Sequence, residues 1–182
     1  MFRKRVAIII ISAVCIISIG VGSTFAVLSS LSKPVSNTFT VGKVEIALTE
    51  TTGESYYMTP GATVAKDPKV TVKGGSEDCW LFVKVDRSAS LDSYISYELS
   101  EGWVALHSQS GVYYRQVEKS SADTELYVLK NNSFTVKDSL DKTHMASITE
   151  AQKLTFTAYA IQSLGVDTAE AAWHEIQSSI QE

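Results

Sequence analysis

The sequence predicts an all-β fold: a two-sheet antiparallel sandwich with a short C-terminal helix, preceded by a hydrophobic signal-peptide helix. Short runs rich in Val, Ile, Thr, Tyr and Phe recur through most of the chain, separated by Gly, Asn, Asp and Ser. One amphipathic helical pattern occurs near the C-terminus, and one uncharged apolar block occurs near the N-terminus. The length of 182 residues suits about one domain.

The first 26 residues have the features of a cleavable secretory signal peptide. A basic start, Met-Phe-Arg-Lys-Arg, is followed by an apolar block at 6–19. This block is shorter than the roughly 20 residues that a transmembrane helix needs. The small residues Thr24 and Ala26 precede Val27 in the pattern that signal peptidases cut. We therefore expect cleavage between Ala26 and Val27, with membrane contact only through the uncleaved signal peptide. A retained anchor is the alternative.

Residues 27–40 form a short segment between the signal peptide and the domain expected at 41–182. The segment has one charged residue, Lys33, and its Pro34 disfavours a regular central strand. Sandwich edges carry unpaired main-chain groups, which can accept a further strand. We expect this assembly segment to leave its own subunit and add to the next one; packing on its own sheet is the alternative. Its apolar residues are Val27, Leu28, Leu31, Val35 and Phe39.

Strands are expected at nine places in the exported domain. Val44, Ile46 and Leu48 alternate with more polar residues, which is typical of a strand with one buried face. Residues 80–83 are apolar on both faces, which indicates a central strand covered on two sides. We expect 74–75, a Gly-Gly pair, to form a hairpin turn. The expected strands are 40–48, 70–73, 80–86, 95–98, 103–106, 112–118, 124–129, 133–136 and 153–161.

One helix is expected near the C-terminus. Asp167 is placed to cap it, and Glu170 follows three residues later, as in a capping box. We expect Trp173 to anchor the helix to the sandwich. The expected apolar face, at helical spacing, comprises Ala169, Ala172, Trp173, Ile176 and Ile180.

Charge and cysteine content restrict the possible partners. Removal of the signal peptide, with its three basic residues, leaves 13 basic and 20 acidic side chains, a net charge of −7. An acidic domain without a Lys/Arg cluster is a poor nucleic-acid binder, because neutralising phosphates supplies most of that affinity. Cys79 is the single thiol after the signal peptide. We interpret it as a small buried hydrophobic residue instead of a reactive thiol.

No motif predicts catalysis, and we expect no catalytic residues, metal site or cofactor. His174-Glu175 begins a helical zinc-protease pattern, but Ser178 stands where the second His is needed. The other histidines, His107 and His144, are distant in sequence, and the G-x-S-x-G nucleophile motif is absent. The aromatic residues leave a carbohydrate-binding surface open, although Trp80 and Trp103 are expected in the core. These aromatic residues are Tyr56, Tyr57, Trp80, Trp103, Tyr113 and Tyr114.

Two motifs near the N-terminus resemble the TasA/camelysin family of exported proteins of Gram-positive bacteria. The stretch 22–26, Gly-Ser-Thr-Phe-Ala, resembles the family's cleavage region. The stretch 37–46, Asn-Thr-Phe-Thr-Val-Gly-Lys-Val-Glu-Ile, resembles its first strand. A Pro-Gly turn at 60–61 and the segments at 66–85 and 154–173 are similar to later parts of family members. The resemblance covers both ends of the chain, with a more divergent middle.

The resemblance implies a fold and a function beyond what the residue patterns predict. It implies jelly-roll topology, processing by a SipW-type signal peptidase, and secretion to the extracellular matrix or cell surface. It also implies self-association into biofilm-matrix fibres, as the major or an accessory subunit, together with accessory matrix proteins. Two alternatives stay open: a monomeric cell-surface binding or adhesion module, and a secreted metallopeptidase.

Replacement of Ala26 by a bulky residue tests the processing site. We expect Ala26→Leu to leave uncleaved precursor in the membrane, because signal peptidase requires a small residue before the cut. Mass spectrometry of the secreted wild-type protein should give a chain that begins Val27-Leu28-Ser29. Secreted protein that retains residues 1–26 would contradict the assignment.

Overall fold

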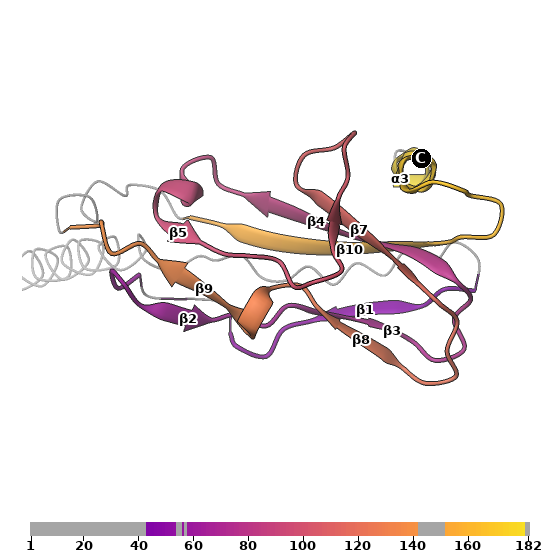
Figure 1. Ribbon diagram of the computed structural model, residues 1–182, viewed down its shortest axis with the longest axis horizontal. Helices are drawn as coiled ribbons and strands as arrows, with labels where there is room; N and C mark the ends of the chain where they lie inside the picture. The colour runs from indigo at the N-terminus through magenta and orange to yellow at the C-terminus, as the bar shows by residue number, and fades with distance from the viewer. Residues whose placement is uncertain (1–42, 54–55, 57, 142–151, 181–182) are drawn as a thin grey trace, which may run out of the picture.

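A computed structural model describes residues 43–53, 56, 58–141 and 152–180 of the chain. Within these residues the chain is mostly β-strand, and it ends in one α-helix (Figure 1). The expected all-β class with a short C-terminal helix is therefore confirmed. The strands are β1 (Ile46–Thr49), β2 (Thr63–Ala65), β3 (Lys69–Val72), β4 (Cys79–Arg87), β5 (Ile95–Ser96), β6 (Val104–Ala105), β7 (Val112–Val117), β8 (Thr124–Tyr127), β9 (Ser133–Val136) and β10 (Leu154–Gln162). The helices are η1 (Leu91–Ser93), η2 (Lys130–Asn132) and α3 (Ala169–Ile180).

The strands form three antiparallel sheets, with the orders β1-β3-β8, β2-β9-β5 and β10-β4-β7-β6. The first two sheets continue into one another, because two hydrogen bonds join the strands across the break. The Lys66 N–H donates to the Asn132 carbonyl (2.7 Å), and the Val128 N–H donates to the Pro68 carbonyl (2.9 Å). In Figure 1 strands β1, β2, β3, β8 and β9 lie below β4, β7 and β10. We call the first two sheets the lower layer and the four-stranded sheet the upper layer.

Strand β4 is buried on both faces, as its sequence predicts. Leu81 and Val83 point into the main core between the two layers. Trp80 and Phe82 point the other way, into a second apolar cluster that α3 covers. Both neighbours of β4 in its sheet are antiparallel strands, β10 and β7. Since every side of β4 is covered, this strand fixes the position of the upper layer and of the helix.

Helix α3 is anchored by Trp173, as expected. The Trp173 ring lies 5.2 Å from the Phe82 ring and 5.3 Å from the Tyr159 ring, between centroids. Two expectations for this helix are wrong. The cap is Thr168 instead of Asp167, because the Thr168 hydroxyl accepts the Ala171 N–H (3.2 Å). Ile180 is 45% exposed, because it lies in the last turn, beyond the end of the covered face.

The strand boundaries agree with the expectations to within a few residues in most places, and three differences are informative. Strand β1 begins at Ile46, and residues 40–42 of its expected range lie outside the described residues. Strand β2 was not expected, because Thr63–Ala65 is too short to show an alternating pattern. The turn at 74–75 does not close a hairpin, because β3 and β4 belong to different sheets.

Cys79 is buried in the main core, as expected from its apolar surroundings. Burial, together with the neighbouring Asp78 charge, raises the pKa of its thiol to about 11. A thiol with such a pKa carries almost no thiolate at neutral pH, so it packs as a small hydrophobic residue.

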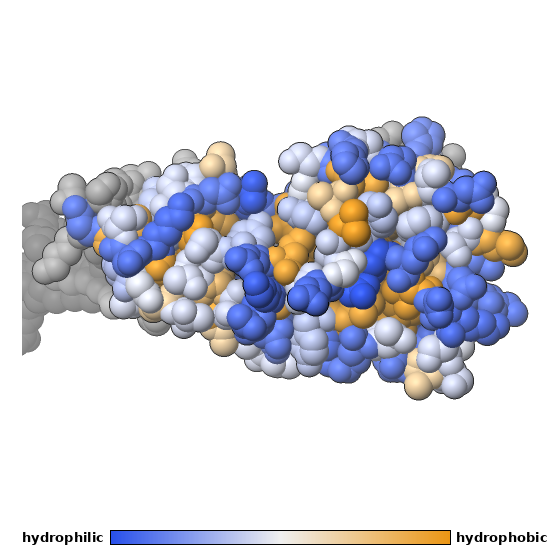
Figure 2. All heavy atoms as spheres, viewed as in Figure 1, coloured by the Kyte–Doolittle hydropathy of each residue, from blue (hydrophilic) through white to orange (hydrophobic). Residues whose placement is uncertain are grey.

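Four large apolar side chains of the described residues are exposed. In the view of Figure 2, apolar residues appear near the middle of the molecule with hydrophilic ones around them. The large apolar side chains that are most exposed come from separate elements: Val104, Tyr127, Leu164 and Ile180. No helix among the described residues is both long enough and apolar enough to cross a membrane.

Removal of the Trp173 ring should release α3 from the upper layer. We expect Trp173→Ala to lower the free energy of unfolding by about 3–5 kcal/mol, the usual cost of deleting a buried aromatic ring. Gln177→Ala is the matched control on the exposed side of the same helix, with an expected change within about 0.5 kcal/mol. Urea unfolding followed by circular dichroism measures both. Equal effects of the two substitutions would refute the anchoring role.

Candidate functional site

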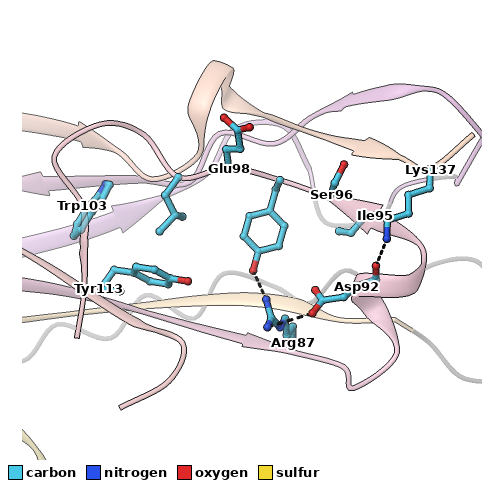
Figure 3. Close-up of a pocket in the computed structure, with 11 residues that line it drawn as sticks. Arg87, Asp92, Ile95, Ser96, Glu98, Trp103, Tyr113 and Lys137 are labelled. Carbon is cyan, nitrogen blue, oxygen red and sulfur yellow. Dashed lines mark hydrogen bonds and ion pairs between the residues drawn. The ribbon is translucent and has the colours of Figure 1, made fainter. Parts of the chain in front are cut away.

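The two layers meet differently on their two sides. On one side β1 lies beside β10. On the other side a groove of about 610 Å³ lies between the outer edges of β5 and β6 (Figure 3). We call it the β5–β6 groove. Its lining residues are Arg87, Asp92, Ile95, Ser96, Tyr97, Glu98, Leu99, Trp103, Ala105, Tyr113 and Lys137.

The β5 side of the groove is a sheet edge with free main-chain groups. The chain from 94 to 100 bonds to the β8–β9 region through alternate residues, since the carbonyls of Tyr94 and Glu98 accept bonds and the Ser100 N–H donates one. In an antiparallel ladder the intervening residues direct their N–H and C=O groups to the opposite side. Within the described part of the chain, no strand pairs with these groups of Ile95, Tyr97 and Leu99.

The β6 side is built on Trp103 and its neighbours. The Trp103 indole N–H donates to the Tyr127 carbonyl (3.0 Å), which ties the β6 strand to the end of β8. The Arg115 guanidinium lies 5.5 Å from the Trp103 ring centroid. Gly102 permits this approach: its φ is +88°, and a Cβ there would stand 2.7 Å from the Arg115 Nη2 atom. Trp103 is therefore held in place as one wall of the groove.

A set of charged residues closes the other end of the groove. The Arg87 guanidinium forms an ion pair with Asp92 (3.2 Å) and donates to the Tyr97 hydroxyl (3.2 Å). Lys137 donates to the Asp92 carbonyl (2.5 Å). Burial raises the pKa of the Tyr97 phenol, and the hydrogen bond from Arg87 opposes this rise. The phenol is thus neutral at physiological pH and can form hydrogen bonds inside the groove.

The chemistry of the groove suits binding. It offers main-chain donors and acceptors on the β5 edge that no described strand pairs with, the aromatic rings of Trp103 and Tyr113, and charges of both signs at one end. An extended chain that pairs with a sheet edge needs the first of these features. A sugar ring that stacks on aromatic faces needs the second.

None of the histidines in the described part of the chain lines the groove. His174 and Glu175 are exposed on α3, His107 is exposed before β7, and His144 lies outside the described residues. Among the described residues, no three His, Cys, Asp or Glu side chains are close enough together to hold a metal ion.

The structure places some of the sequence-predicted residues and not others. The cleavage residues Thr24, Ala26 and Val27 lie outside the described residues, as do Leu28, Leu31, Val35 and Phe39 of the assembly segment. Two of the aromatic candidates, Trp103 and Tyr113, come together in the groove. Trp103 is half-buried and packs against the main core from its edge, so its expected place in the core is met in part.

The remaining aromatic candidates lie elsewhere. Trp80 is buried, as expected, and its indole donates to the Val166 carbonyl (2.9 Å). The Tyr114 ring packs edge-on against Trp80 in the cluster under α3. Tyr56 lies in a separate polar cluster, and Tyr57 lies outside the described residues.

Sequence reasoning missed Arg87, Tyr97 and Lys137 as groove residues. Each lies on a different element, and no local pattern joins them. The alternation of apolar and polar residues in the expected strand at 95–98 is the one signal that could have placed Tyr97 on the inward face of that strand.

Comparison of the chain with protein-family models, curated proteins and solved structures finds no match. The resemblance to the TasA/camelysin family stays a prediction that rests on the N-terminal motifs.

Alanine substitutions on α3 test the metallopeptidase alternative. We expect His174→Ala and Glu175→Ala each to change the free energy of unfolding by less than about 0.5 kcal/mol, because both side chains are exposed. Elemental analysis and a peptidase assay of the wild type accompany them. Stoichiometric zinc in the wild type, lost together with peptidase activity in either variant, would show that the protein is a metallopeptidase.

Proposed function

We propose that this protein is an exported structural subunit whose copies join by strand addition into extracellular matrix fibres. The observation that carries the proposal is the β5–β6 groove, where the main-chain groups of a sheet edge face an aromatic wall. Such an edge either is protected or accepts another strand. In this proposal the edge is the acceptor, and the assembly segment 27–40 of a neighbouring copy is the donor.

The composition of the donor segment supports this role. Its apolar residues are interspersed with Ser, Asn and Thr, and it has a single charge at Lys33. Fully extended, its 14 residues reach about 45 Å. Strand β4, which runs the length of the upper layer with nine residues, spans roughly 30 Å. The donor can therefore reach beyond its own domain.

The position of the groove favours an open chain of subunits. The donor segment precedes Lys43, whose carbonyl accepts the Glu77 N–H next to the start of β4. The groove is lined by Arg87, at the end of β4. A donor that starts near one end of a subunit and binds near the other end of the next gives a head-to-tail contact. Repeated head-to-tail contacts that do not close into a ring build a filament.

Strand addition uses two kinds of contact, main-chain hydrogen bonds and side-chain packing. Main-chain bonds to Ile95, Tyr97 and Leu99 would supply affinity, and alternate apolar donor side chains would pack on Trp103 and Tyr113. The proposal assigns no catalytic role, metal or cofactor to the chain.

We also propose jelly-roll winding for the domain. Around the two layers the order is β1, β2–β3, β8–β9, β5, then β6, β7, β4 and β10. This order supports a jelly roll, because it alternates early and late segments of the chain around the sandwich.

The remaining parts of the proposal come from the TasA/camelysin resemblance. They are cleavage by a SipW-type signal peptidase after Ala26, release to the extracellular matrix or cell surface, and assembly with accessory matrix proteins. A signal peptide followed by an acidic domain supports export without nucleic-acid partners.

A monomeric carbohydrate-binding module is the second candidate. The presence of Trp103 and Tyr113 in one groove favours it, because sugar rings stack on such side chains. A fibre subunit would form large particles after purification, whereas a carbohydrate-binding module would stay monomeric.

Two variants test strand addition, one in the donor segment and one in the acceptor groove. We expect deletion of Val27–Asn37 from the mature chain to give a folded, monomeric domain, because the donor is lost. We expect Ala105→Arg, which puts a bulky charge in the groove, to block the acceptor in the same way. Ala171→Arg on the exposed face of α3 is the matched control and should assemble like the wild type.

Light scattering and electron microscopy measure assembly, and circular dichroism confirms that each variant is folded. Full-length fibres from the folded deletion variant would rule out the donor role of 27–37. Normal fibres from Ala105→Arg would place the acceptor elsewhere. A wild-type protein that stays monomeric and binds polysaccharide would favour the second candidate.

A further inference from the structure

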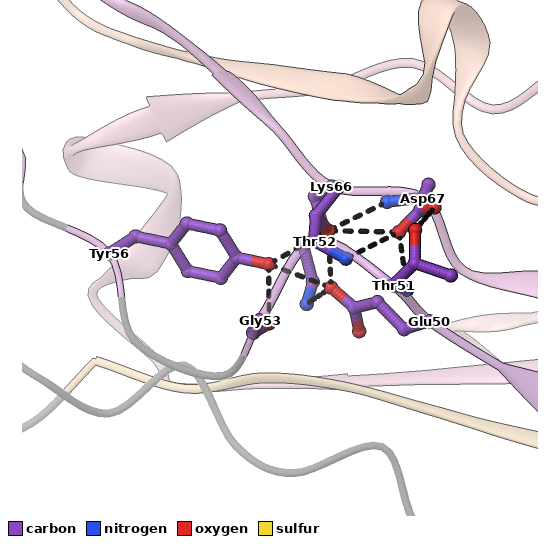
Figure 4. Close-up of polar contacts among 7 residues, drawn as sticks. All are labelled: Glu50, Thr51, Thr52, Gly53, Tyr56, Lys66 and Asp67. Carbon is purple, nitrogen blue, oxygen red and sulfur yellow. Dashed lines mark hydrogen bonds and ion pairs between the residues drawn. The ribbon is translucent and has the colours of Figure 1, made fainter.

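A lysine and a glutamate meet on the side of the lower layer that faces the main core. Glu50 directly follows β1, and Lys66 directly follows β2, at the junction with β3. Because β1 and β3 pair with Thr49 opposite Lys69, the ends of these segments lie side by side. The Lys66 Nζ atom is 2.7 Å from the Glu50 Oε1 atom, and each side chain is only 1% exposed (Figure 4).

As an ion pair this contact is poorly satisfied. The Glu50 Oε2 atom is buried and has no hydrogen-bond partner among the described residues. The Lys66 ammonium has three N–H donors, and its one hydrogen-bond acceptor in the described structure is Glu50. Its other neighbours are the rings of Tyr56 and Phe156, with centroids at 5.2 and 5.7 Å. Burial of two charges costs several kcal/mol for each ion unless further hydrogen bonds satisfy them.

The two carboxylate oxygens of Glu50 differ sharply in their surroundings. Three donor groups lie within hydrogen-bond distance of Oε1: the Lys66 ammonium, the Tyr56 hydroxyl (2.8 Å) and the Thr52 hydroxyl (3.2 Å). Each hydroxyl proton is shared with a second acceptor, the Gly53 carbonyl for Tyr56 and the Asp67 carboxylate for Thr52. Donors aimed at one oxygen polarise the C=O bond, as in an oxyanion hole.

Asp67 holds this arrangement in place. Its carboxylate accepts the backbone N–H and the hydroxyl of both Thr51 and Thr52. Partial burial acts to raise the pKa of Asp67, but these hydrogen bonds outweigh it and lower the pKa to about 2. Asp67 is therefore ionised at physiological pH and fixes the Thr52 hydroxyl beside Glu50.

We propose that Lys66 and Glu50 condense into an intramolecular amide cross-link. A proton moves from Lys66 Nζ to Glu50 Oε2, and the neutral amine attacks the carboxyl carbon, Cδ. A second proton moves from Nζ to Oε2, the Cδ–Oε2 bond breaks, and Oε2 leaves as water. The ammonium and the carboxylate become one amide N–H, one C=O and one water molecule. No oxidant or reductant takes part.

The geometry and the burial both favour this step. Because Cδ is bonded to Oε1, the amine lies within about 4 Å of Cδ, and a small shift reaches the ~3–3.5 Å separation of reacting atoms. The terminal torsion of a glutamate is soft, so the carboxyl plane can turn its face towards Nζ. The reaction removes both buried charges and the unpartnered Oε2 atom, while Oε1 keeps its two hydroxyl donors, Tyr56 and Thr52. The cross-link would join the end of β1 to the β2–β3 junction across 16 residues of chain and constrain the unfolded state.

Peptide mass mapping of the full-length exported protein tests the proposal. Trypsin finds no Lys or Arg between Lys43 and Lys66, so the free chain yields peptide 44–66. Trypsin does not cut after a lysine whose amine is in an amide. We therefore expect a peptide 44–69 whose mass is lower by one water, about 18 Da, than its sequence requires.

The double substitution Glu50→Gln with Lys66→Met is the control. Methionine has no amine, so the cross-link cannot form, and the two neutral side chains leave no buried charge unpaired. We expect its peptide to have the mass of its sequence. Tyr56→Phe keeps the amine and the carboxyl but removes one donor to Oε1, and we expect it to lower the cross-linked fraction.

The wild-type measurement alone can overturn the proposal. A folded wild-type protein that yields peptide 44–66 at its sequence mass contains no cross-link. A loss of water that persists in the double variant would assign the lost water to other residues. Neither outcome depends on fibre formation, so this test is separate from that of the proposed function.

Discussion

Burial of β4 on both faces is the constraint on which the rest of the structure depends. Leu81 and Val83 require the lower layer on one face, and Phe82 requires α3 on the other. Because its neighbours β10 and β7 occupy both edges, β4 cannot move without disturbing the sheet. The helix, the core and the separation of the two layers all follow from this one strand.

With the layers fixed in this way, their two sides have different roles. The side of β1 and β10 is close-packed and lies directly after the predicted donor segment. The side of β5 and β6 has short strands and a groove, which Trp103 lines at one end and Arg87 and Asp92 line at the other. The proposed cross-link at Glu50 lies at the end of β1, so it would tie the strand that follows the donor segment to the β2–β3 junction.

The sequence predicted those features that depend on local pattern. Alternation located the buried face of β1, and the two-sided run at 80–83 identified the central strand. Features that depend on contacts distant in sequence were missed. A Lys-Asp-Pro stretch is typical of an exposed turn, yet Lys66 is buried because Glu50 and two aromatic rings surround it. The groove was also missed, since its walls come from strands that pair with different partners.

Hydrogen exchange on assembled and unassembled protein tests strand addition most directly. The account predicts that the amides of Tyr97 and Leu99 exchange rapidly in the monomer and slowly in fibres, because a donor strand then bonds to them. The Ser100 amide already donates to the Val128 carbonyl, so it should be protected in both states. Fibres in which Tyr97 and Leu99 exchange as rapidly as in the monomer would contradict the account.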